Sequence, residues 1–324
     1  METVFANRNR FLIEALRRIA EEREIEMSSF SHDWIVRLCR NRVSRFVYGY
    51  NFDLNSSAAS LVANDKCALS DILTLHGIPH VEHELFLAPE LSGYISSDGN
   101  WPRAMQFVER AGYPLVCKDN QGTGGNMVFR VENQRELEGA FQQIHALGRG
   151  LALSPYYPIE AEYRIILLDG LELFSYEKQQ PYVLGDGQST YYKLIQSKFS
   201  HDSELCRVAF TEPVFPLHET PDKDSKIPLI WKHNLSKGAV PLFNLGPTVW
   251  QKVFELSRKA LLSTGLRFAC VDVIKANGEI RVLEINAGVM LESVSRYSEE
   301  GHKLALNVYA RAVDAMFDPE NPVR

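Results

Sequence analysis

The sequence predicts an α+β fold with antiparallel sheets. Two pairs of apolar runs are each split by a tight-turn dipeptide, Asp169-Gly170 in one pair and Asn277-Gly278 in the other. Such dipeptides between β-rich runs are strong signals for a two-residue hairpin. Helical periodicity marks three further segments, residues 7–22, 249–263 and 304–316. Hairpins with helices between and after them are typical of an α+β arrangement.

The second hairpin, built from residues 268–274 and 280–285, carries three oxygen ligands: Asp272 on its first strand, and Glu284 and Asn286 on its second. Glu284 and Asn286 are two residues apart and share a strand face, and Asp272 can face them across the hairpin. Two carboxylates and an amide oxygen suit Mg²⁺ better than zinc. These residues could instead form the wet face of a strand. Because they interrupt an apolar strand, the metal interpretation is favoured.

Composition narrows the class of protein. The chain has 324 residues, 45% of them hydrophobic and 23% charged, and a net charge of −6. The negative charge argues against nucleic acid or an anionic membrane as a partner. No apolar run approaches the ~18 residues of a membrane span, and the amphipathic start lacks the apolar core of a signal peptide. Five cysteines without paired spacing predict a reduced, cytoplasmic protein.

The rest of the chain is less regular. Asn64 or Asp65 is expected to cap a helix that runs to about Leu75. A basic run over residues 31–50 could meet an anionic substrate, but a solvated face is the favoured interpretation. Residues 198–228 are polar and weakly periodic, which predicts a long surface excursion.

A glycine-rich loop, Gln121–Gly125, lies between two predicted strands at residues 113–118 and 128–131. Glycines allow several backbone N–H groups to point at one anion. The loop is not a Walker A loop, because Lys and Ser/Thr do not follow at the required positions. Lys118, at the end of the preceding strand, could supply a charge for a phosphate, and Lys66 a second one. For Lys66 an ordinary exposed helix position is equally consistent.

In this order, these segments resemble the ATP-grasp superfamily of carboxylate–amine ligases. The likeness includes the ATP-grasp parts of cyanophycin synthetase and bifunctional glutathione synthetase, and the ribosomal-protein glutamate ligases. It covers roughly residues 65–286 and implies two α+β subdomains that clamp ATP between antiparallel sheets. The expected parts are an N-terminal pre-ATP-grasp region over 1–62, a lid subdomain over 63–156 and a core subdomain over 157–324. The segments that carry the likeness are DKCALSDILTLHGIP, YPLVCKDNQGTGGNMVFRV, EYRIILLDGLELFSYEK, PYVLGDGQST, HNLSKGA and DVIKANGEIRVLEIN.

The resemblance also implies roles for single residues. Lys66 and Lys118 would hold the α- and β-phosphates of ATP. Glu162 would accept the ribose hydroxyls, with Glu160 as the weaker alternative. The loop that would fold over the phosphates is Gly122, Thr123, Gly124 and Gly125, and the hinge that would line the adenine runs from Ser154 through Tyr156 to Tyr157.

The remaining roles concern the reaction. Arg164 would approach the γ-phosphate or the carboxylate substrate, and Lys178 and Asn234 would lie near the γ-phosphate and the acyl phosphate. Two Mg²⁺ ions, with Mn²⁺ able to substitute, would be held by Asp272, Glu284 and Asn286. The implied reaction converts a carboxylate to an acyl phosphate, which an amine then attacks. The implied substrates are amino acids or peptides, and a homodimer is conceivable.

The sequence departs from the family in three ways. Relatives commonly have Pro-Gly after the metal asparagine, whereas Ala287–Met290 follows here, which leaves the acceptor amine open. The chain is shorter than the two-module relatives and would run one ligation only. Residues 1–62 carry no motif of their own. Two alternatives stay open: a small-molecule kinase of the same fold, and a non-catalytic nucleotide-binding module.

Overall fold

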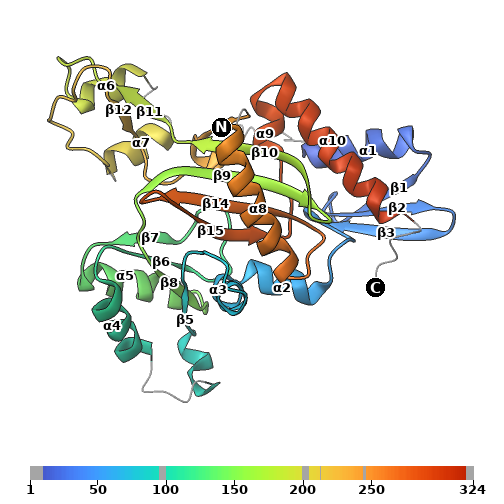
Figure 1. Cartoon of the computed structure of the whole chain (residues 1–324), viewed down its shortest axis with the longest axis horizontal. Helices are drawn as coiled ribbons and strands as arrows, with labels where there is room; N and C mark the ends of the chain where they lie inside the picture. Colours follow the sequence, from blue (N-terminus) through green and yellow to red (C-terminus); the bar gives the residue numbers. More distant parts are fainter. Residues whose placement is uncertain (1–9, 95–99, 199–203, 212, 244–245, 319–324) are drawn as a thin grey trace, which may run out of the picture. The chain divides into compact units, whose positions relative to one another are not determined.

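The structure is a computed structural model that describes residues 10–94, 100–198, 204–211, 213–243 and 246–318 (Figure 1). Contacts divide the chain into two compact units. The first comprises Met1–Gly122, Asn126–Ser175 and Gly246–Arg324, and the second comprises Thr123–Gly125 and Tyr176–Leu245. No helix among the described residues is long and apolar enough to cross a membrane.

The first unit begins with a helix and a four-stranded antiparallel sheet. The predicted first helix is present as α1, which buries Phe11, Leu12 and Leu16, and residues 7–9 of that prediction lie outside the described residues. The sheet is a meander in the order β1-β2-β3-β4, and the basic run over residues 31–50 lies within it. The elements are α1 (Phe11–Glu22), β1 (Glu26–Phe30), β2 (Ile35–Arg40), β3 (Val43–Tyr48) and β4 (Asn51–Phe52).

Two arginines of this meander form hydrogen bonds with backbone carbonyls at the end of α10. Arg40 Nη2 donates to the carbonyl of Phe317 at 3.3 Å, and Arg45 Nε donates to that of Met316 at 2.8 Å. These carbonyls end the last helix, where orphan acceptors need partners. The favoured interpretation of a wholly solvated basic face is therefore wrong for Arg40 and Arg45, which the sequence pattern could not show.

A second sheet of the first unit, in the order β5-β8-β6-β7, is antiparallel and packs against α4 and α5 around Phe86, Phe107 and Leu153. Asp65 caps α3 as predicted, accepting from the N–H groups of Cys67 and Ala68. The elements are α2 (Ser57–Asn64), α3 (Lys66–Leu75), β5 (Glu84–Phe86), α4 (Asn100–Ala111), β6 (Leu115–Asp119), β7 (Val128–Val131), α5 (Gln134–His145) and β8 (Leu151–Pro155), with a 3₁₀ turn η1 at Pro89–Tyr94.

The central sheet of the first unit contains both predicted hairpins. β14 lies between β9 and β15 and is antiparallel to both. Figure 1 shows α8 lying across β9, β14 and β15. The bulk of β14 is fully buried, which explains its continuous apolar run. The elements are β9 (Ile159–Leu168), β10 (Leu171–Gln179), α8 (Pro247–Ser263), β14 (Phe268–Ala276), β15 (Glu279–Asn286), α9 (Glu292–Tyr297) and α10 (Glu299–Met316).

The second unit has its own small core. The end of β10 pairs with β13 here, and β11 pairs with β12. Tyr191, Ile195 and Cys206 are buried together, so the predicted polar excursion over residues 198–228 is wrong in part, because it contains a packed helix and a strand. The elements are β11 (Tyr182–Leu184), α6 (Tyr191–Lys198), α7 (Glu204–Thr211), β12 (Lys226–Pro228), a 3₁₀ turn η2 (Leu235–Lys237) and β13 (Val240–Leu242).

Candidate active site

Three charged residues of the first unit lie in one row across three strands. Asp272 of β14 is the register partner of Arg164 on β9 and of Glu284 on β15. The next register pair on the turn side is Val273 with Val282, so Leu283 is the extra residue of a β-bulge. Bulges beside active sites re-aim side chains, and this bulge adjoins Glu284 directly.

Asp272 and Arg164 form a bidentate ion pair. Arg164 Nε lies 2.7 Å from Asp272 Oδ1, and Arg164 Nη2 lies 2.6 Å from Asp272 Oδ2. The aspartate is fully buried and the arginine side chain is 17% exposed. A buried carboxylate needs such compensation. The guanidinium therefore supplies at Asp272 the positive charge that a cation would otherwise bring.

The predicted metal ligands suit magnesium in their chemistry. Asp272 and Glu284 are direct cross-strand partners, and Asn286 Nδ2 donates to Glu284 Oε1 at 3.0 Å. Carboxylate and amide oxygens are the donors that Mg²⁺ prefers. Among the described residues, no three His, Cys, Asp or Glu side chains form a metal-binding group. An amide must therefore join the two carboxylates if a cation binds here.

Removing the guanidinium tests this arrangement. Arg164→Met is expected to lower the free energy of unfolding by about 3 kcal/mol, because Asp272 stays buried without its bidentate partner. Added Mg²⁺ is expected to raise the melting temperature more in this variant than in the wild type, since it would compensate the same carboxylate. Calorimetry with and without Mg²⁺ measures both effects.

Arg267→Met is the matched control, because Arg267 pairs with the half-exposed Asp169 at 2.7 Å. A loss of about 1 kcal/mol or less and no added response to Mg²⁺ are expected there. An equal Mg²⁺ response in the wild type, in Arg164→Met and in this control would argue against metal binding at Asp272.

Two lysines of the first unit are buried. Lys66 opens α3 and Lys118 lies on β6, and each is 7% exposed. Lys66 Nζ donates to the carbonyls of Asn120 at 3.2 Å and Gly122 at 2.8 Å. The exposed-helix alternative for Lys66 is therefore wrong.

Burial lowers the pKa of Lys118 to about 8, and repulsion from Lys66 adds to this effect. Attraction to Glu284 and Glu162 acts in the opposite direction. Lys118 therefore lies within electrostatic reach of Lys66 and of both carboxylates. Two desolvated ammonium groups of like charge are unfavourable alone, and a polyanion would relieve that repulsion.

The affinity for nucleotide is expected to depend on pH. Lys118 loses its proton as pH rises through about 8, so the free protein loses a positive charge that a phosphate needs. The dissociation constant of metal-free ADP is expected to rise above pH 8, and titration calorimetry from pH 6.5 to 9.5 measures it. In Lys118→Arg, whose guanidinium stays charged, the rise above pH 8 is expected to disappear. An unchanged pH profile in that variant would assign the effect to another group.

The start of the glycine loop belongs to the first unit and requires glycine. A Cβ at Gly122 would lie 2.8 Å from the Cβ of Asp119. Asp119 is fixed there, because its Oδ1 accepts from Gln121 N at 3.0 Å and its Oδ2 from Arg149 Nη1 at 2.6 Å. The loop is thus anchored at its base by a buried carboxylate.

The rest of the loop, Thr123–Gly125, belongs to the second unit. Gly125 has φ +72°, and a Cβ added there would lie 3.2 Å from Asn234 Nδ2. Asn234 also caps the η2 turn, because its Oδ1 accepts from Ser236 N at 2.9 Å. Glycine is therefore required at the loop end by both backbone conformation and space.

Lys178 also lies in the second unit and is 5% exposed. Its carbonyl is 2.9 Å from Nδ1 of His233, which is itself buried. Without metal-like spacing, His233 is expected from the sequence to be an ordinary surface or loop residue; it does lie in a loop, directly before Asn234, but it is buried. The sequence could not show this, because burial of a histidine leaves no local pattern.

The predicted nucleoside contacts lie on adjoining elements of the first unit. Ser154 is buried in β8 and Glu162 is buried in β9, on the same strand face as Arg164. Glu160 is exposed instead and pairs with Lys275 at 2.8 Å, which favours Glu162 over Glu160 for a ribose. The hinge rings are covered by guanidinium groups, Tyr156 by Arg130 at 4.3 Å and Tyr157 by Arg281 at 5.0 Å.

The N-terminal region is hydrogen-bonded to Glu292, in the segment that follows Asn286. Glu292 accepts the N–H groups of Phe11 at 2.9 Å and Leu12 at 3.2 Å, the Tyr50 hydroxyl at 3.1 Å and the Arg296 guanidinium at 3.0 Å. The two N–H groups open α1 and have no partner within that helix. The two segments in which this sequence departs from the ATP-grasp ligases that it resembles, the N-terminal region and the segment after Asn286, are therefore in contact.

Glu292→Gln is expected to lower the free energy of unfolding by about 2 kcal/mol, because an amide cannot accept all four of these bonds. Denaturant unfolding measures the loss. Glu299→Gln, at an 83% exposed side chain, is the matched control and is expected to change stability by less than about 0.5 kcal/mol. Equal losses in both variants would show that the buried network does not stabilise the fold.

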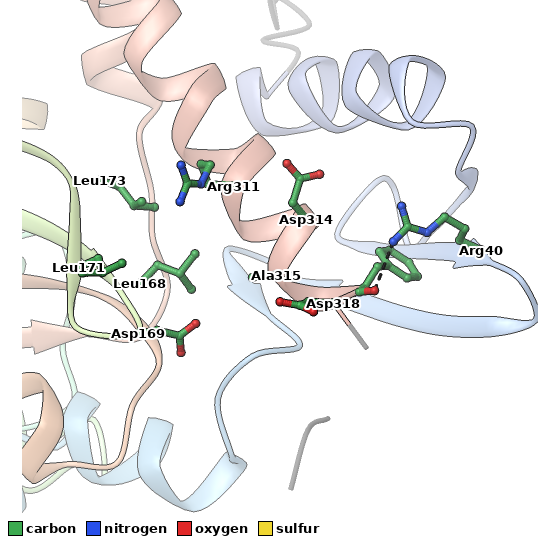
Figure 2. A pocket seen from close by; sticks show the side chains of 10 residues that line it. Arg40, Leu168, Asp169, Leu171, Leu173, Arg311, Asp314, Ala315 and Asp318 are labelled. Atoms are coloured by element: carbon green, nitrogen blue, oxygen red, sulfur yellow. Dashed lines mark hydrogen bonds between the residues drawn. The ribbon is translucent and has the colours of Figure 1, made fainter. Parts of the chain in front are cut away.

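A cavity of about 450 Å³ lies against α10 (Figure 2). Figure 2 shows Asp314 and Asp318 on its helical side. The Arg40 guanidinium lies over the ring of Phe317, 4.8 Å from its centroid. Two of its acids are already compensated by surface arginines, Asp314 by Arg23 and Asp169 by Arg267. The charges of this cavity are therefore largely satisfied by the fold.

The chain is similar in sequence to known proteins. No protein-family model matches the chain. It is 22% identical over 295 residues to cyanophycin synthetase from Nostoc sp., covering 86% of this chain, and 24% identical over 287 residues to that from Geminocystis herdmanii, covering 81%. An alignment over 86% of the chain extends into residues 1–62. The chain spans 31% of the length of these curated relatives.

The fold is similar to those of solved structures, among them the following two. A bifunctional glutathione synthetase from Pasteurella multocida has a TM-score of 0.53 at 15% identity, with 93% of this chain and 44% of that chain covered. A D-alanine–D-alanine ligase from Bacillus anthracis has a TM-score of 0.51 at 15% identity, with 80% and 68% covered.

The predicted fold is thereby confirmed: the chain has the α+β fold with antiparallel sheets of ATP-grasp structures. By sequence it is a distant relative of cyanophycin synthetase.

Proposed function

We propose that the chain is an ATP-dependent ligase that joins a free carboxylate to an amine through an acyl phosphate, releasing ADP and phosphate. The carboxylate would belong to an amino acid or peptide. The observation that carries this proposal is the row of Arg164, Asp272 and Glu284 beside two buried lysines. Such a row combines anion-binding and cation-binding groups, as transfer of a phosphoryl group requires.

Binding of ATP is assigned to groups of the first unit. Lys66 and Lys118 would hold the α- and β-phosphates, which would relieve the repulsion between the two ammonium groups. Glu162 would accept the ribose hydroxyls. The bulged Leu283 packs against a buried cluster that includes Ile274 and would form an apolar surface for the purine.

Asp272, Glu284 and Asn286 would hold magnesium, which neutralises charge on the β- and γ-phosphates when bound. Arg164 would then be partly released from Asp272 to approach the γ-phosphate or the carboxylate. Gly122–Gly125 would close over the phosphates and keep water from the acyl phosphate. Lys178 and Asn234 would compensate charge on the phosphoryl group as it transfers.

The test is ADP release measured against a panel of amino acids and peptides, with mass detection of products. A ligase gives a product one water lighter than the sum of its two substrates. ADP release that needs no amine, with a stable phosphorylated product, would identify a kinase instead. Nucleotide binding without turnover across the panel would identify a binding module.

Three expectations from the sequence accompany this proposal. They are the division into a pre-ATP-grasp region, a lid and a core at residues 62 and 156, a cytoplasmic location, and a homodimer. Size-exclusion chromatography with light scattering would test the last of these directly.

A further inference from the structure

Asn64 connects two parts of the candidate site. The sequence offers Asn64 or Asp65 as the cap of α3, and Asp65 takes that role. Asn64 instead ends α2, directly before the helix that Lys66 opens is capped. Its Oδ1 accepts from the backbone N–H of Ala287 at 3.3 Å, across 223 residues of sequence. Ala287 directly follows the predicted metal ligand Asn286, so one side chain joins the phosphate side of the site to its metal side.

The backbone after Asn286 needs partners outside the central sheet, because the pairing of β15 with β14 ends at Asn286. Ala287 and Val289 are both 0% exposed. A buried backbone N–H without a hydrogen bond is costly. Asn64 accepts from the N–H of Ala287, and the carbonyl of Tyr50 accepts from that of Val289 at 3.1 Å. The N-terminal region therefore fixes the path of the chain directly after the metal ligand.

Asn55, in the same region, holds the opposite end of the hairpin. Its Oδ1 accepts from the N–H groups of Arg267 at 2.9 Å and Phe268 at 3.0 Å, and its Nδ2 donates to the carbonyl of Phe268 at 2.7 Å. These groups lie where β14 begins, ahead of its pairing with β15. Asp272 lies further along and is held by register partners on both sides. Asn55 therefore stabilises the sheet, whereas Asn64 acts next to a ligand.

Asn286 can bind a cation only through its amide oxygen. Its Nδ2 donates to Glu284 Oε1 at 3.0 Å, which leaves Oδ1 as the metal-binding atom. The aim of that oxygen depends on the backbone at the end of β15, and the bond from Ala287 to Asn64 restrains this backbone at the next peptide. Loss of a group that orients a metal ligand typically weakens metal binding about 10- to 100-fold.

We propose that Asn64 is a positioning residue for the metal ligand Asn286 and keeps this ligand in place relative to Lys66. The inference rests on the proposed function, because it takes Asn286 as a ligand of magnesium. Lys66 has its own anchors, the carbonyls of Asn120 and Gly122. Loss of the Asn64 bond therefore releases the metal side alone, so binding of the cation weakens while binding of metal-free nucleotide persists.

Mn²⁺ binding to the ADP-loaded chain, measured by electron paramagnetic resonance, tests this proposal. Asn64→Ala is expected to raise the dissociation constant of Mn²⁺ about tenfold, and that of metal-free ADP less than twofold. Asn64→Asp keeps an acceptor oxygen for the N–H of Ala287 and is expected to stay within threefold of the wild type for Mn²⁺. Asn64 is exposed at the end of a helix, so both variants are expected to fold.

Asn51→Ala is the matched control. Asn51 is an exposed asparagine of the same region that lies beside Gly288, but its Nδ2 donates to the carbonyl of Tyr48 at 3.3 Å. Its dissociation constant for Mn²⁺ is expected to stay within twofold. Asn55→Ala is expected to lower the melting temperature and also to leave Mn²⁺ binding within twofold, which separates lost stability from lost positioning.

The proposal is overturned if Asn64→Ala binds Mn²⁺ like the wild type, or if Asn64→Asp or either control loses as much affinity as Asn64→Ala. A wild-type chain that binds no Mn²⁺ in the presence of ADP would overturn it together with the metal assignment of the proposed function. These titrations involve no turnover, so failure of the ADP-release test would leave their outcome intact.

Discussion

Glu284→Gln is expected to lower kcat for ADP release by about 1000-fold, because the change removes one of two carboxylates that would hold magnesium. The side chain keeps its size, and Asn286 can still interact with its oxygen. The fold and the binding of metal-free ADP are therefore expected to persist. Steady-state kinetics at saturating Mg²⁺ and calorimetry with ADP measure the two effects separately.

Glu279→Gln is the matched control for this prediction. Glu279 lies on the same strand, but its side chain is 68% exposed and pairs with Arg281. A change of less than twofold is expected there. Wild-type turnover in Glu284→Gln at saturating Mg²⁺ would remove the metal assignment, and with it the reason for placing phosphoryl transfer on β14 and β15.

Lys118→Met is expected to raise KM for ATP by about 10- to 100-fold. A hydrogen bond to a charged group contributes roughly 1.5–3 kcal/mol, and each 1.4 kcal/mol is about tenfold in affinity. The same change is expected to increase the free energy of unfolding, because it removes a buried cation that Lys66 repels. Loss of binding together with a gain in stability distinguishes a functional lysine from a structural one.

The comparison variant is Lys275→Met, on β14, where the side chain is 41% exposed and pairs with Glu160. Its KM for ATP is expected to stay within twofold. If Lys118→Met both bound ATP normally and lost stability, Lys118 would belong to the fold and not to the phosphate site.

Local patterns in the sequence determined the two hairpins, the caps and the glycine loop. Asn277-Gly278 specifies a turn by its own backbone preferences, and Asp65 caps α3 with its own side chain. The resemblance to the ATP-grasp superfamily was visible for the same reason, since its motifs are short and ordered along the chain. The pairing of Asp272 with Glu284 does not follow from the Asn277-Gly278 hairpin alone, because a regular ladder would place Asp272 opposite Leu283 and the bulge at Leu283 shifts the register.

Only the tertiary structure decided which groups are buried and which are paired. Arg164 is 108 residues from Asp272 in sequence, and nothing in either segment indicates that the arginine pairs with the expected metal ligand. Burial of Lys66 and His83, and the contact of Glu292 with the start of α1, likewise depend on distant segments. Desolvation and ion pairing act through space, so a sequence can name charged residues but cannot show which of them the fold compensates.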